Sequence, residues 1–525
     1  MEREIPFLRQ KKIFVFALSV LLFAIIAAFA PSMAHPFMSD DYHVLSALQT
    51  LPKDFSFFFT GNGKYLIPVT KLLWVGEWML FGTREAGYHF TSLLLHIINT
   101  SLVILFVTRL LKSKWTGLLA GAFFALSASH WRTTMWMSAQ MKLLAAFFLL
   151  LGLVCFLAYL RTGKGRYLGW TLVAQIGMPF SSALGVELPL VLALLYLFVQ
   201  RTNGKRVRVP QKCVWKSLGV LLALALVYVV LQRLLYAHAN AYLLSSGGIV
   251  QAFAHLPQAV RWLAAGLFEG LMRSSTGIFI GALPSIFTLH AAAVPFGIRL
   301  LPLGLLLILL FLPKRRHWGL PALLFAAWTL LLYVPPVLPD LSQGFIEEWF
   351  VTRARYFYLP AIPAAALLAL LLTHVKLPKR RRPFLRVGVI AVLALFGATV
   401  LLSNLSRIHQ LESYAATYTR DFGQVRDTYV GDLRILLSQT WGTQVVTIRD
   451  KLLGTVTGID YAAHNVYPSH LAKVYLTADE LASFRFLPDG FSADYGVTFD
   501  GSLWPPLYEE EYKKSGTDPQ AGVPH

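Results

Sequence analysis

Long apolar runs separated by short polar segments dominate residues 1–404 of this chain. A helix needs about twenty apolar residues to cross the hydrocarbon core of a bilayer, where no water satisfies an irregular backbone. Each long run therefore predicts a transmembrane helix. The clearest runs cover residues 13–30, 88–108, 141–160, 183–200, 217–236, 294–312, 359–375 and 387–403. With the shorter runs at 116–129, 167–180 and 319–338, the pattern predicts about eleven spans.

Basic residues follow every second run. They cluster at 109–114, 161–166, 201–216, 314–316 and 376–382. Cytoplasmic loops are enriched in Lys and Arg, so we expect these loops in the cytoplasm, together with the N-terminus and its Arg9, Lys11 and Lys12. An odd number of spans then places the C-terminus outside. The sequence predicts a multi-pass protein of the bacterial inner (plasma) membrane.

Composition agrees with this class of protein. Hydrophobic residues make up 56% of the 525 residues and charged residues only 14%, unlike an ordinary soluble domain. The formal net charge of +20 comes from residues 1–404, at +25, because residues 405–525 carry −5. Since the basic residues lie in short loops beside the membrane, nucleic-acid binding is not expected. Cys155 lies in a run and Cys213 in a basic loop, which indicates neither a disulfide framework nor a metal site.

Three longer segments interrupt the alternation of apolar runs and short loops. All three lie on the expected outer side. They cover residues 31–86, 237–290 and 339–358. The first contains an amphipathic, Trp-containing stretch at 65–81, which predicts a helix lying in the membrane interface. Because the cytoplasmic loops are short and merely basic, we expect the function on the outer side.

The chain changes character near residue 405. Short β-rich runs at 444–448 and 473–476 stand among helical pieces and a Pro-rich end. We therefore expect two domains, an all-α polytopic membrane domain at 1–404 and a small extracytoplasmic α/β domain at 405–525.

Two neighbouring carboxylates in the first loop, Asp40 and Asp41, are candidates for general-base chemistry. In such a pair, one carboxylate raises the pKa of the other and can orient a bound acceptor. The alternative is structural, with Ser39 or Asp40 capping a helix that begins near Tyr42. The spacing alone does not decide between these roles.

Two arginines, Arg353 and Arg355, precede the tenth run. An arginine at headgroup depth can hold a phosphate with two parallel hydrogen bonds. The alternative is an arginine that snorkels within an aromatic belt, which residue type alone favours.

Further polar residues lie at the expected outer ends of the spans. Glu187 is about one turn into the sixth run, where a carboxylate is costly and indicates either function or pairing with a cation. His130, Arg132, Trp136 and Lys142 form a polar crossing between the third and fourth spans. Taken singly, these four fit interfacial anchors better than catalysts. His130, Lys142 and Glu187 are nevertheless candidates for a donor or acceptor site.

Four segments in order carry a resemblance to a known family. They are Ser39-Asp40-Asp41-Tyr42 with Tyr88-His89-Phe90-Thr91-Ser92-Leu93-Leu94-Leu95-His96-Ile97-Ile98-Asn99, His130 ahead of Trp136-Met137-Ser138, Ser181-Ser182 through Leu188-Pro189, and Arg355-Tyr356-Phe357-Tyr358-Leu359-Pro360. Together they resemble the motifs of GT-C-fold glycosyltransferases, closest to the protein O-mannosyltransferases and their bacterial relatives. The resemblance covers roughly residues 13–404.

The chain departs from the family pattern at three places. Arg132 stands where the family often has Glu, and Lys142 where it often has Asp. Ser182-Ala183 replaces a Lys-Glu pair, with Glu187 four residues onward. These departures leave the acceptor open.

The resemblance implies an inverting sugar transfer on the outer face of the membrane. The donor would be a sugar on a polyprenyl phosphate, and the acceptor a glycan, lipid or protein. Asp40 would deprotonate the acceptor hydroxyl with Asp41 as its orienting partner, while Arg355 and then Arg353 would hold the departing phosphate. Membrane lipids are the other expected partners. No cofactor is predicted, and a role for a divalent metal stays open.

Two other classes of function remain. A transporter would place polar residues at mid-membrane in broken helices of two related halves, which the sequence does not show. A non-catalytic envelope-assembly protein could keep the same frame, and the reversed charges at Arg132 and Lys142 are compatible with it. The sequence names neither the sugar nor the acceptor.

Overall fold

A computed structural model of the chain describes residues 4–37, 40–49, 57–60, 65–203, 207–235, 319–337, 357–373, 383–439, 446–450, 473–476, 480 and 484–488. Two compact units can be distinguished. The first, which we call the helical unit, consists of Met1–His35 and Phe55–Thr417. The second unit consists of Pro36–Asp54 and Tyr418–His525.

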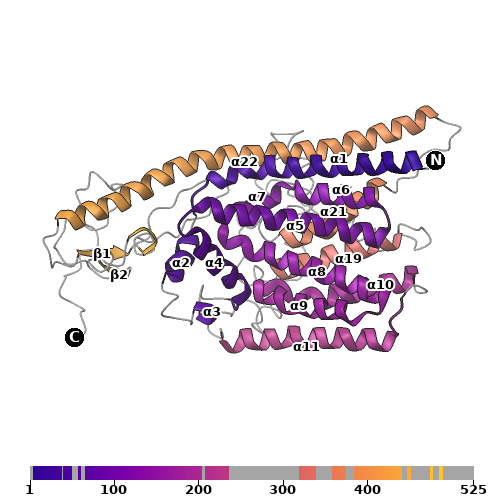
Figure 1. Ribbon diagram of the computed structural model, residues 1–525, viewed down its shortest axis with the longest axis horizontal. Helices are drawn as coiled ribbons and strands as arrows, with labels where there is room; N and C mark the ends of the chain where they lie inside the picture. The colour runs from indigo at the N-terminus through magenta and orange to yellow at the C-terminus, as the bar shows by residue number, and fades with distance from the viewer. Residues whose placement is uncertain are drawn as a thin grey trace, which may run out of the picture. The chain divides into compact units, whose positions relative to one another are not determined.

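Helices that coincide with the apolar runs build the helical unit (Figure 1). They are α1 (Glu4–Phe29), α5 (Glu85–Leu111), α6 (Lys114–Ala125), α8 (Gln140–Thr162), α9 (Gly165–Ser181), α10 (Leu188–Asn203), α11 (Gln211–Leu235), α19 (Gly319–Val337), α21 (Tyr358–Thr373) and the first part of α22 (Pro383–Gln439). Every predicted run coincides with one of these helices except 294–312, which lies outside the described residues. The prediction of an all-α polytopic membrane domain is confirmed.

Among the described residues, 6 helical stretches are long and apolar enough to cross a membrane. They are Lys12–Ala34, Glu85–Leu111, Met137–Thr162, Gly185–Thr202, Gln211–Leu235 and Val387–Ser413. Two shorter apolar helices, Gly319–Leu332 and Tyr358–Thr373, accompany them. The chain is therefore a multi-pass integral membrane protein, while a total of about eleven spans stays a prediction.

Successive helices of the helical unit run in opposite directions. His96, in the first half of α5, reaches the carbonyl of Ala125 at the end of α6, at 2.9 Å. Arg161 at the end of α8 donates to the carbonyl of Arg109 at the end of α5, at 3.0 Å. The bundle thus has two ends. We call them the crossing end, after the segment 126–139 that joins α6 to α8 there, and the basic end.

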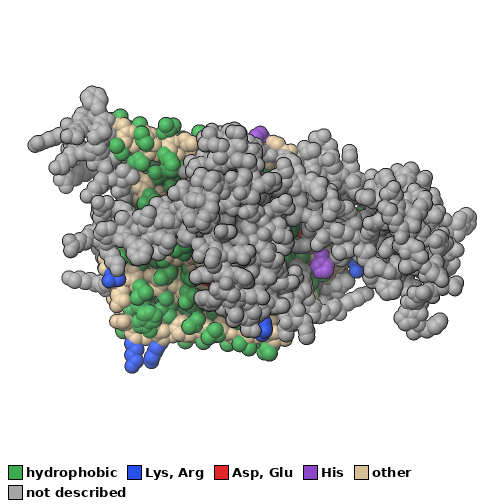
Figure 2. Space-filling view, turned by 180° about the vertical axis from the view of Figure 1, so that it is seen from behind, with side chains coloured by type: hydrophobic (Ala, Val, Ile, Leu, Met, Phe, Trp, Pro, Cys, Tyr) green, Lys and Arg blue, Asp and Glu red, His purple; other side chains and the backbone are tan. Residues whose placement is uncertain are grey.

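The basic end carries exposed Lys and Arg side chains and exposed tryptophans. Trp115, Trp170 and Trp215 lie within the first two turns of α6, α9 and α11 and are each about half exposed. Figure 2 shows Lys and Arg side chains at the edge of a broad hydrophobic face. Amphipathic rings beside basic residues are typical of a membrane–water interface, and apolar faces such as this one are typical of contact with lipid.

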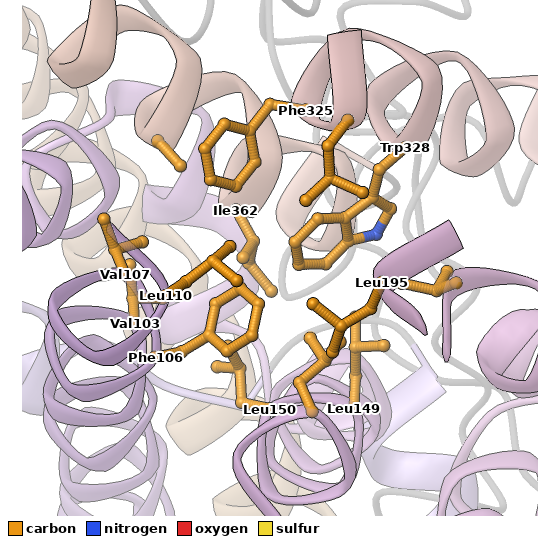
Figure 3. Packing of buried hydrophobic residues seen from close by; sticks show 14 of the residues in the cluster. Val103, Phe106, Val107, Leu110, Leu149, Leu150, Leu195, Phe325, Trp328 and Ile362 are labelled. Atoms are coloured by element: carbon orange, nitrogen blue, oxygen red, sulfur yellow. The ribbon is translucent and has the colours of Figure 1, made fainter. Parts of the chain in front are cut away.

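Large apolar side chains fill the middle of the bundle, among them residues of α5, α8, α10, α19 and α21 (Figure 3). Trp328 of α19 meets the Phe106 ring of α5 edge-on, with ring centroids 5.9 Å apart. Leu149, Leu195 and Ile362 from α8, α10 and α21 lie around this pair. Because lipid chains are as apolar as leucine, van der Waals packing rather than escape from water holds such helices together.

Small residues bring α6 close to α5. A Cβ atom on Gly117 would lie 2.8 Å from the Ile104 carbonyl oxygen and would meet the Thr108 side chain. A Cβ on Gly121 would meet the Ile104 side chain. Glycines four residues apart on one face allow this close approach of two helix backbones.

The predicted amphipathic stretch 65–81 forms a helix, α4 (Pro68–Phe81). Its buried residues are Thr70, Lys71, Trp74 and Glu77, all with polar atoms. The exposed side carries Leu72, Met79 and Leu80. This arrangement places polar groups toward the protein and apolar groups outward, as expected for a helix lying against lipid in the interface.

The second unit contains α2 (Asp40–Leu48), the end of α22 and two strands. Strand β1 (Val446–Asp450) pairs in parallel with β2 (Phe484–Pro488), with Val446 opposite Phe484. The predicted strand at 444–448 is found two residues later, as β1. The predicted strand at 473–476 is wrong, since Lys473, Val474 and Tyr475 are helical. A parallel pair needs a crossover between its strands, and these residues lie in that crossover.

Candidate active site

A buried polar segment joins α6 to α8 at the crossing end. It consists of three short helical elements, η2 (Ala128–His130), α7 (Trp131–Met135) and η3 (Met137–Ala139). Every residue from 123 to 140 is buried. A segment this polar is stable in a buried position only when its donors and acceptors find partners. Those partners come from distant parts of the chain.

Glu412 of α22 supplies one set of partners. Its carboxylate accepts a hydrogen bond from the Trp131 indole Nε1 and contacts His35 Nε2, both at 2.7 Å. The His35 carbonyl in turn lies 3.0 Å from His89 Nε2. Because all four residues are buried, these bonds fix the crossing segment against α5, α22 and the end of the first predicted span.

His130 lies in a cluster of rings. Its ring centroid is 4.5 Å from that of Tyr358 and 4.7 Å from that of Phe124, and His96 is 5.5 Å away. Burial lowers the pKa of His130 well below its ordinary value, and the nearby His96 lowers it further. His130 is therefore neutral at physiological pH.

Gln140, the first residue of α8, ties together α4, α5 and α8. Its side-chain nitrogen donates to Glu77 Oε1 at 2.7 Å, to the Tyr88 carbonyl at 3.0 Å and to Ser92 Oγ at 3.1 Å. Its side-chain oxygen accepts from the indole of Trp74 at 3.0 Å. This amide holds Trp74 and Glu77 on the polar face of α4, while Thr70 on the same face donates to the Ser181 carbonyl at 2.9 Å.

Lys142 lies two residues further along α8, also buried. Its ammonium group donates to Ser182 Oγ at 2.8 Å, and its charge acts on the buried carboxyl of Glu187. Ser182 and Glu187 flank the short element η4 (Ala183–Glu187). Within η4, a Cβ on Gly185 would come 2.5 Å from the backbone of Pro179, so only glycine fits there. The structure thus brings the predicted candidates Lys142 and Glu187 together.

The interpretation of His130, Arg132, Trp136 and Lys142 as interfacial anchors does not fit their burial, because Arg132 is the most exposed of them at 8%. Arg132 lies over the ring of Trp136, at 5.2 Å from the centroid, inside the protein. An anchor would present its charged or aromatic tip to the headgroups.

Lys71 of α4 is a further buried cation, which sequence reasoning did not single out. It donates to the Phe57 carbonyl at 2.7 Å and lies over the Phe57 ring. Burial lowers the pKa of Lys71 to about 8. Its ammonium group is therefore still mostly protonated at neutral pH, with a smaller margin than an exposed lysine has.

The acidic pair of the first loop lies at the start of α2, in the second unit. The cap interpretation expected this helix to begin near Tyr42. In the structure it begins at Asp40. Asp41 is fully buried, as is Tyr42.

Arg353 and Arg355 lie outside the described residues, as do Glu347 and Glu348. The described part of that segment begins at Phe357, and Tyr358 opens α21. In the part of the chain that is described, no group of three or more His, Cys, Asp or Glu residues could hold a metal ion. The expectation of a reaction without a cofactor stays a prediction.

Sequence reasoning missed three of these partners: His35, Gln140 and Glu412. Gln140 offers a signal in retrospect, since it is a polar residue next to a predicted span, where a polar group needs a reason. Glu412 lies nine residues beyond the run 387–403 and offers none. His35 offers none, because its partner lies 377 positions away in the sequence.

Comparisons with protein-family models and with curated proteins found no match. Among solved structures, the chain is similar to ArnT from Cupriavidus metallidurans bound to undecaprenyl phosphate. The identity is 14%, over 89% of this chain and 86% of that chain, with a TM-score of 0.43.

The chain is also similar to the Archaeoglobus fulgidus oligosaccharyltransferase tethered with an acceptor peptide. The identity is 13%, over 90% of this chain and 63% of that chain, with a TM-score of 0.48. The chain thus spans less than two thirds of the length of the oligosaccharyltransferase. Similarities of this extent identify neither an activity nor a substrate.

Proposed function

We propose that this chain is a glycosyltransferase that moves a sugar from a polyprenyl-phosphate-linked donor to an acceptor on the outer face of the membrane. The reaction inverts the anomeric carbon, with Asp40 as general base. Asp41 orients the acceptor, and Arg355, with Arg353, holds the phosphate.

One observation supports the proposal above the others. The motif segments within the helical unit, far apart in sequence, meet at the crossing end. His96 of the motif stretch 88–99 contacts Tyr358 of the stretch 355–360, at 2.8 Å from ring nitrogen to phenol oxygen. His130 lies against both rings, and Lys142 reaches Ser182. A frame that only crossed the membrane would have no need of buried polar residues at this cost.

The chemistry follows from the residue types. Asp40 takes the proton of the acceptor hydroxyl, whose oxygen attacks the anomeric carbon as the bond from that carbon to the phosphate oxygen breaks. The bonding electrons leave with the polyprenyl phosphate, whose extra charge the guanidinium of Arg355 stabilises.

Lys142, Glu187 and His130 form the remaining part of the proposed site, on the donor or acceptor side. A buried Lys beside a buried carboxyl can bind sugar hydroxyls through both donors and acceptors. His130, being neutral, contributes a ring face and hydrogen bonding rather than charge.

The test is sugar transfer by the purified protein in nanodiscs with a polyprenyl-phosphate-linked sugar and a lysate-derived acceptor mixture. We expect wild type to release polyprenyl phosphate and label an acceptor. Asp40→Asn, which keeps the size of the side chain and its ability to cap a helix, serves as the matched variant.

Each alternative predicts a different result. A transporter, reconstituted in liposomes, would move the donor or another solute across the membrane without breaking the sugar–phosphate bond. An assembly protein would do neither. Absence of transfer with every polyprenyl-phosphate sugar tried would reject the glycosyltransferase proposal.

A further inference from the structure

Four polar side chains form a closed group at the crossing end, which we call the polar cluster. They are His96 and Asn99 of α5, His130 of the crossing segment and Tyr358 of α21. His96 Nδ1 lies 2.8 Å from the Tyr358 hydroxyl, and Asn99 Nδ2 lies 3.3 Å from it. The ring centroid of His130 is 4.5 Å from that of Tyr358. All four side chains are fully buried.

The donors that α5 and α21 bring to the polar cluster are all used within the protein. The Ala125 carbonyl can only accept, so His96 Nε2, at 2.9 Å, carries the ring proton, and Nδ1 accepts from the Tyr358 hydroxyl. Asn99 donates one N–H to the Leu143 carbonyl at 2.9 Å and the other to the phenol oxygen. Asn99 Oδ1 is the acceptor that is left over, and these residues offer no further donor for it.

The His130 ring is also left with an acceptor. It hydrogen-bonds the Phe124 carbonyl, which can only accept, and its Nδ1 lies 3.4 Å from Ser129 Oγ. Among the described residues, neither His130 Nε2 nor Asn99 Oδ1 has a hydrogen-bond partner. Nδ1 therefore carries the proton of His130, and Nε2 carries the lone pair. Buried polar atoms without a partner are costly, and native proteins retain few of them.

We propose that His130 Nε2 and Asn99 Oδ1 form a sugar subsite, which accepts hydrogen bonds from hydroxyl groups of the donor's sugar. Two acceptors without a spare donor suit a ligand that brings donors, as sugar hydroxyls do. The same pair disfavours a phosphate, whose oxygens need donors. The inference rests on the function proposed above, and it assigns recognition of the sugar, as distinct from the phosphate, to the polar cluster.

The sugar subsite is closed in the structure, and His130 is the member better placed to open it. Element η2 ends at His130 and α7 begins at the next residue, so His130 lies at the junction of two short helical elements. Asn99 lies inside the 27 residues of α5. A junction can change its backbone angles without breaking a continuous run of helical hydrogen bonds. We therefore expect the sugar to displace His130 and to leave Asn99 in place.

The experiment compares binding of two kinds of ligand in nanodiscs. One is decaprenyl phosphate, and the other is the same lipid phosphate linked to mannose, glucose or galactose. The affinity ratio, the Kd of the bare lipid phosphate divided by that of the sugar-linked lipid, isolates the contribution of the sugar. We expect wild type to bind at least one sugar-linked lipid more tightly than the bare lipid phosphate.

His130→Asn keeps an N–H donor near the place of Nδ1 and removes Nε2. We expect it to lower the affinity ratio about 10-fold, the effect of one lost hydrogen bond, while binding of the bare lipid phosphate is unchanged. His130→Gln, whose side-chain oxygen lies near the place of Nε2, should retain most of the ratio. If His130→Asn does not yield a monodisperse protein, His130→Phe keeps a ring and takes its place, with the same expectation.

Tyr228→Phe is the matched control. It removes a buried phenol hydroxyl outside the polar cluster, which donates to the Leu66 carbonyl at 3.1 Å, and should leave the affinity ratio unchanged.

The outcomes separate the two proposals. A wild-type affinity ratio in His130→Asn overturns the sugar subsite, and so do equal losses for both ligands, because they indicate a general structural effect. A wild type that binds all these lipids equally overturns the sugar subsite alone, since sugar transfer is measured separately. A wild type that binds none of them and transfers no sugar overturns both this inference and the proposed function.

Discussion

The two ends of the helical unit satisfy their polar side chains in different ways. At the crossing end, polar side chains are buried and bonded to residues far away in the sequence, as His35 is to Glu412. At the basic end, Lys and Arg side chains reach into solvent, and the hydrogen bond from Arg161 to the Arg109 carbonyl is exposed. Water satisfies polar groups at no structural cost, whereas a buried polar group needs a built partner. The buried and bonded charges of Glu412 and Lys142 at the crossing end indicate that this end has a task beyond topology.

Orientation is the first property that separates the ends. Cys213, exposed at the start of α11, lies at the basic end, whereas Cys155 is buried in α8. If the basic end faces the cytoplasm, a membrane-impermeant maleimide should label the protein only in broken cells. An exposed residue of the second unit changed to cysteine, Asp427→Cys, should label in intact cells. Labelling of Cys213 in intact cells would invert the assignment of the two ends.

Catalysis gives the next largest effect. Asp40→Asn removes a general base, which is typically worth about 10²–10⁴ in rate, whereas Asn caps a helix about as well as Asp. We expect sugar transfer to fall by that factor at equal amounts of folded protein, and Asp41→Asn to have a smaller effect. Asp427→Asn, exposed on α22, is the control and should have normal activity. Full activity of Asp40→Asn would leave only the capping role.

The free energy of unfolding should fall more when a polar contact is removed at the crossing end than at the basic end. Glu412→Ala leaves the donors of Trp131 and His35 buried without their acceptor, at about 1–3 kcal/mol each. We expect a loss of about 3 kcal/mol in the free energy of unfolding. Arg161→Ala at the basic end should change it by no more than about 0.5 kcal/mol. Denaturation in mixed detergent micelles measures both, and similar losses at the two ends would contradict the comparison.

The smallest effect concerns pH. The pKa of His130 is lowered in the folded protein, so below about pH 6.5 the unfolded state binds more protons than the folded one. Stability should therefore fall as the pH drops through 6.5, by up to about 1.4 kcal/mol per pH unit from this group. His130→Phe keeps a ring against Tyr358 and should reduce that slope between pH 7.5 and 5.5. Melting temperatures of both proteins provide the measurement, and equal slopes would argue against a buried neutral His130.

Helices could be predicted from the sequence where composition alone determines the secondary structure. The run at 88–108 has no alternative to a helix in a membrane, and α5 covers it. The run at 473–476 was misjudged because β-branched and aromatic residues describe a half-buried surface rather than a backbone preference. The tertiary context of residues 473–476 favours a helix instead.

The site was predictable only in part, and for a physical reason. Lys142 and Glu187 could be singled out because charge in an apolar run is costly wherever it lies. Their meeting, and the bonds of Glu412 and Tyr358, depend on contacts across 40 to 377 positions, which no local pattern encodes. Burial of Arg132 likewise follows from the packing of the crossing segment and not from its residue type.

Helix α6 has a consequence for how the protein is made. At 12 residues it is shorter than the roughly twenty that a stable solitary membrane insertion requires. Its glycine face needs α5, and its other packing partner, α21, is synthesised more than 200 residues later. During synthesis, α6 therefore waits beside α5 with one face uncovered. Mutations that slow insertion of α21 should expose the nascent chain to membrane proteases at α6, long before any catalytic residue is affected.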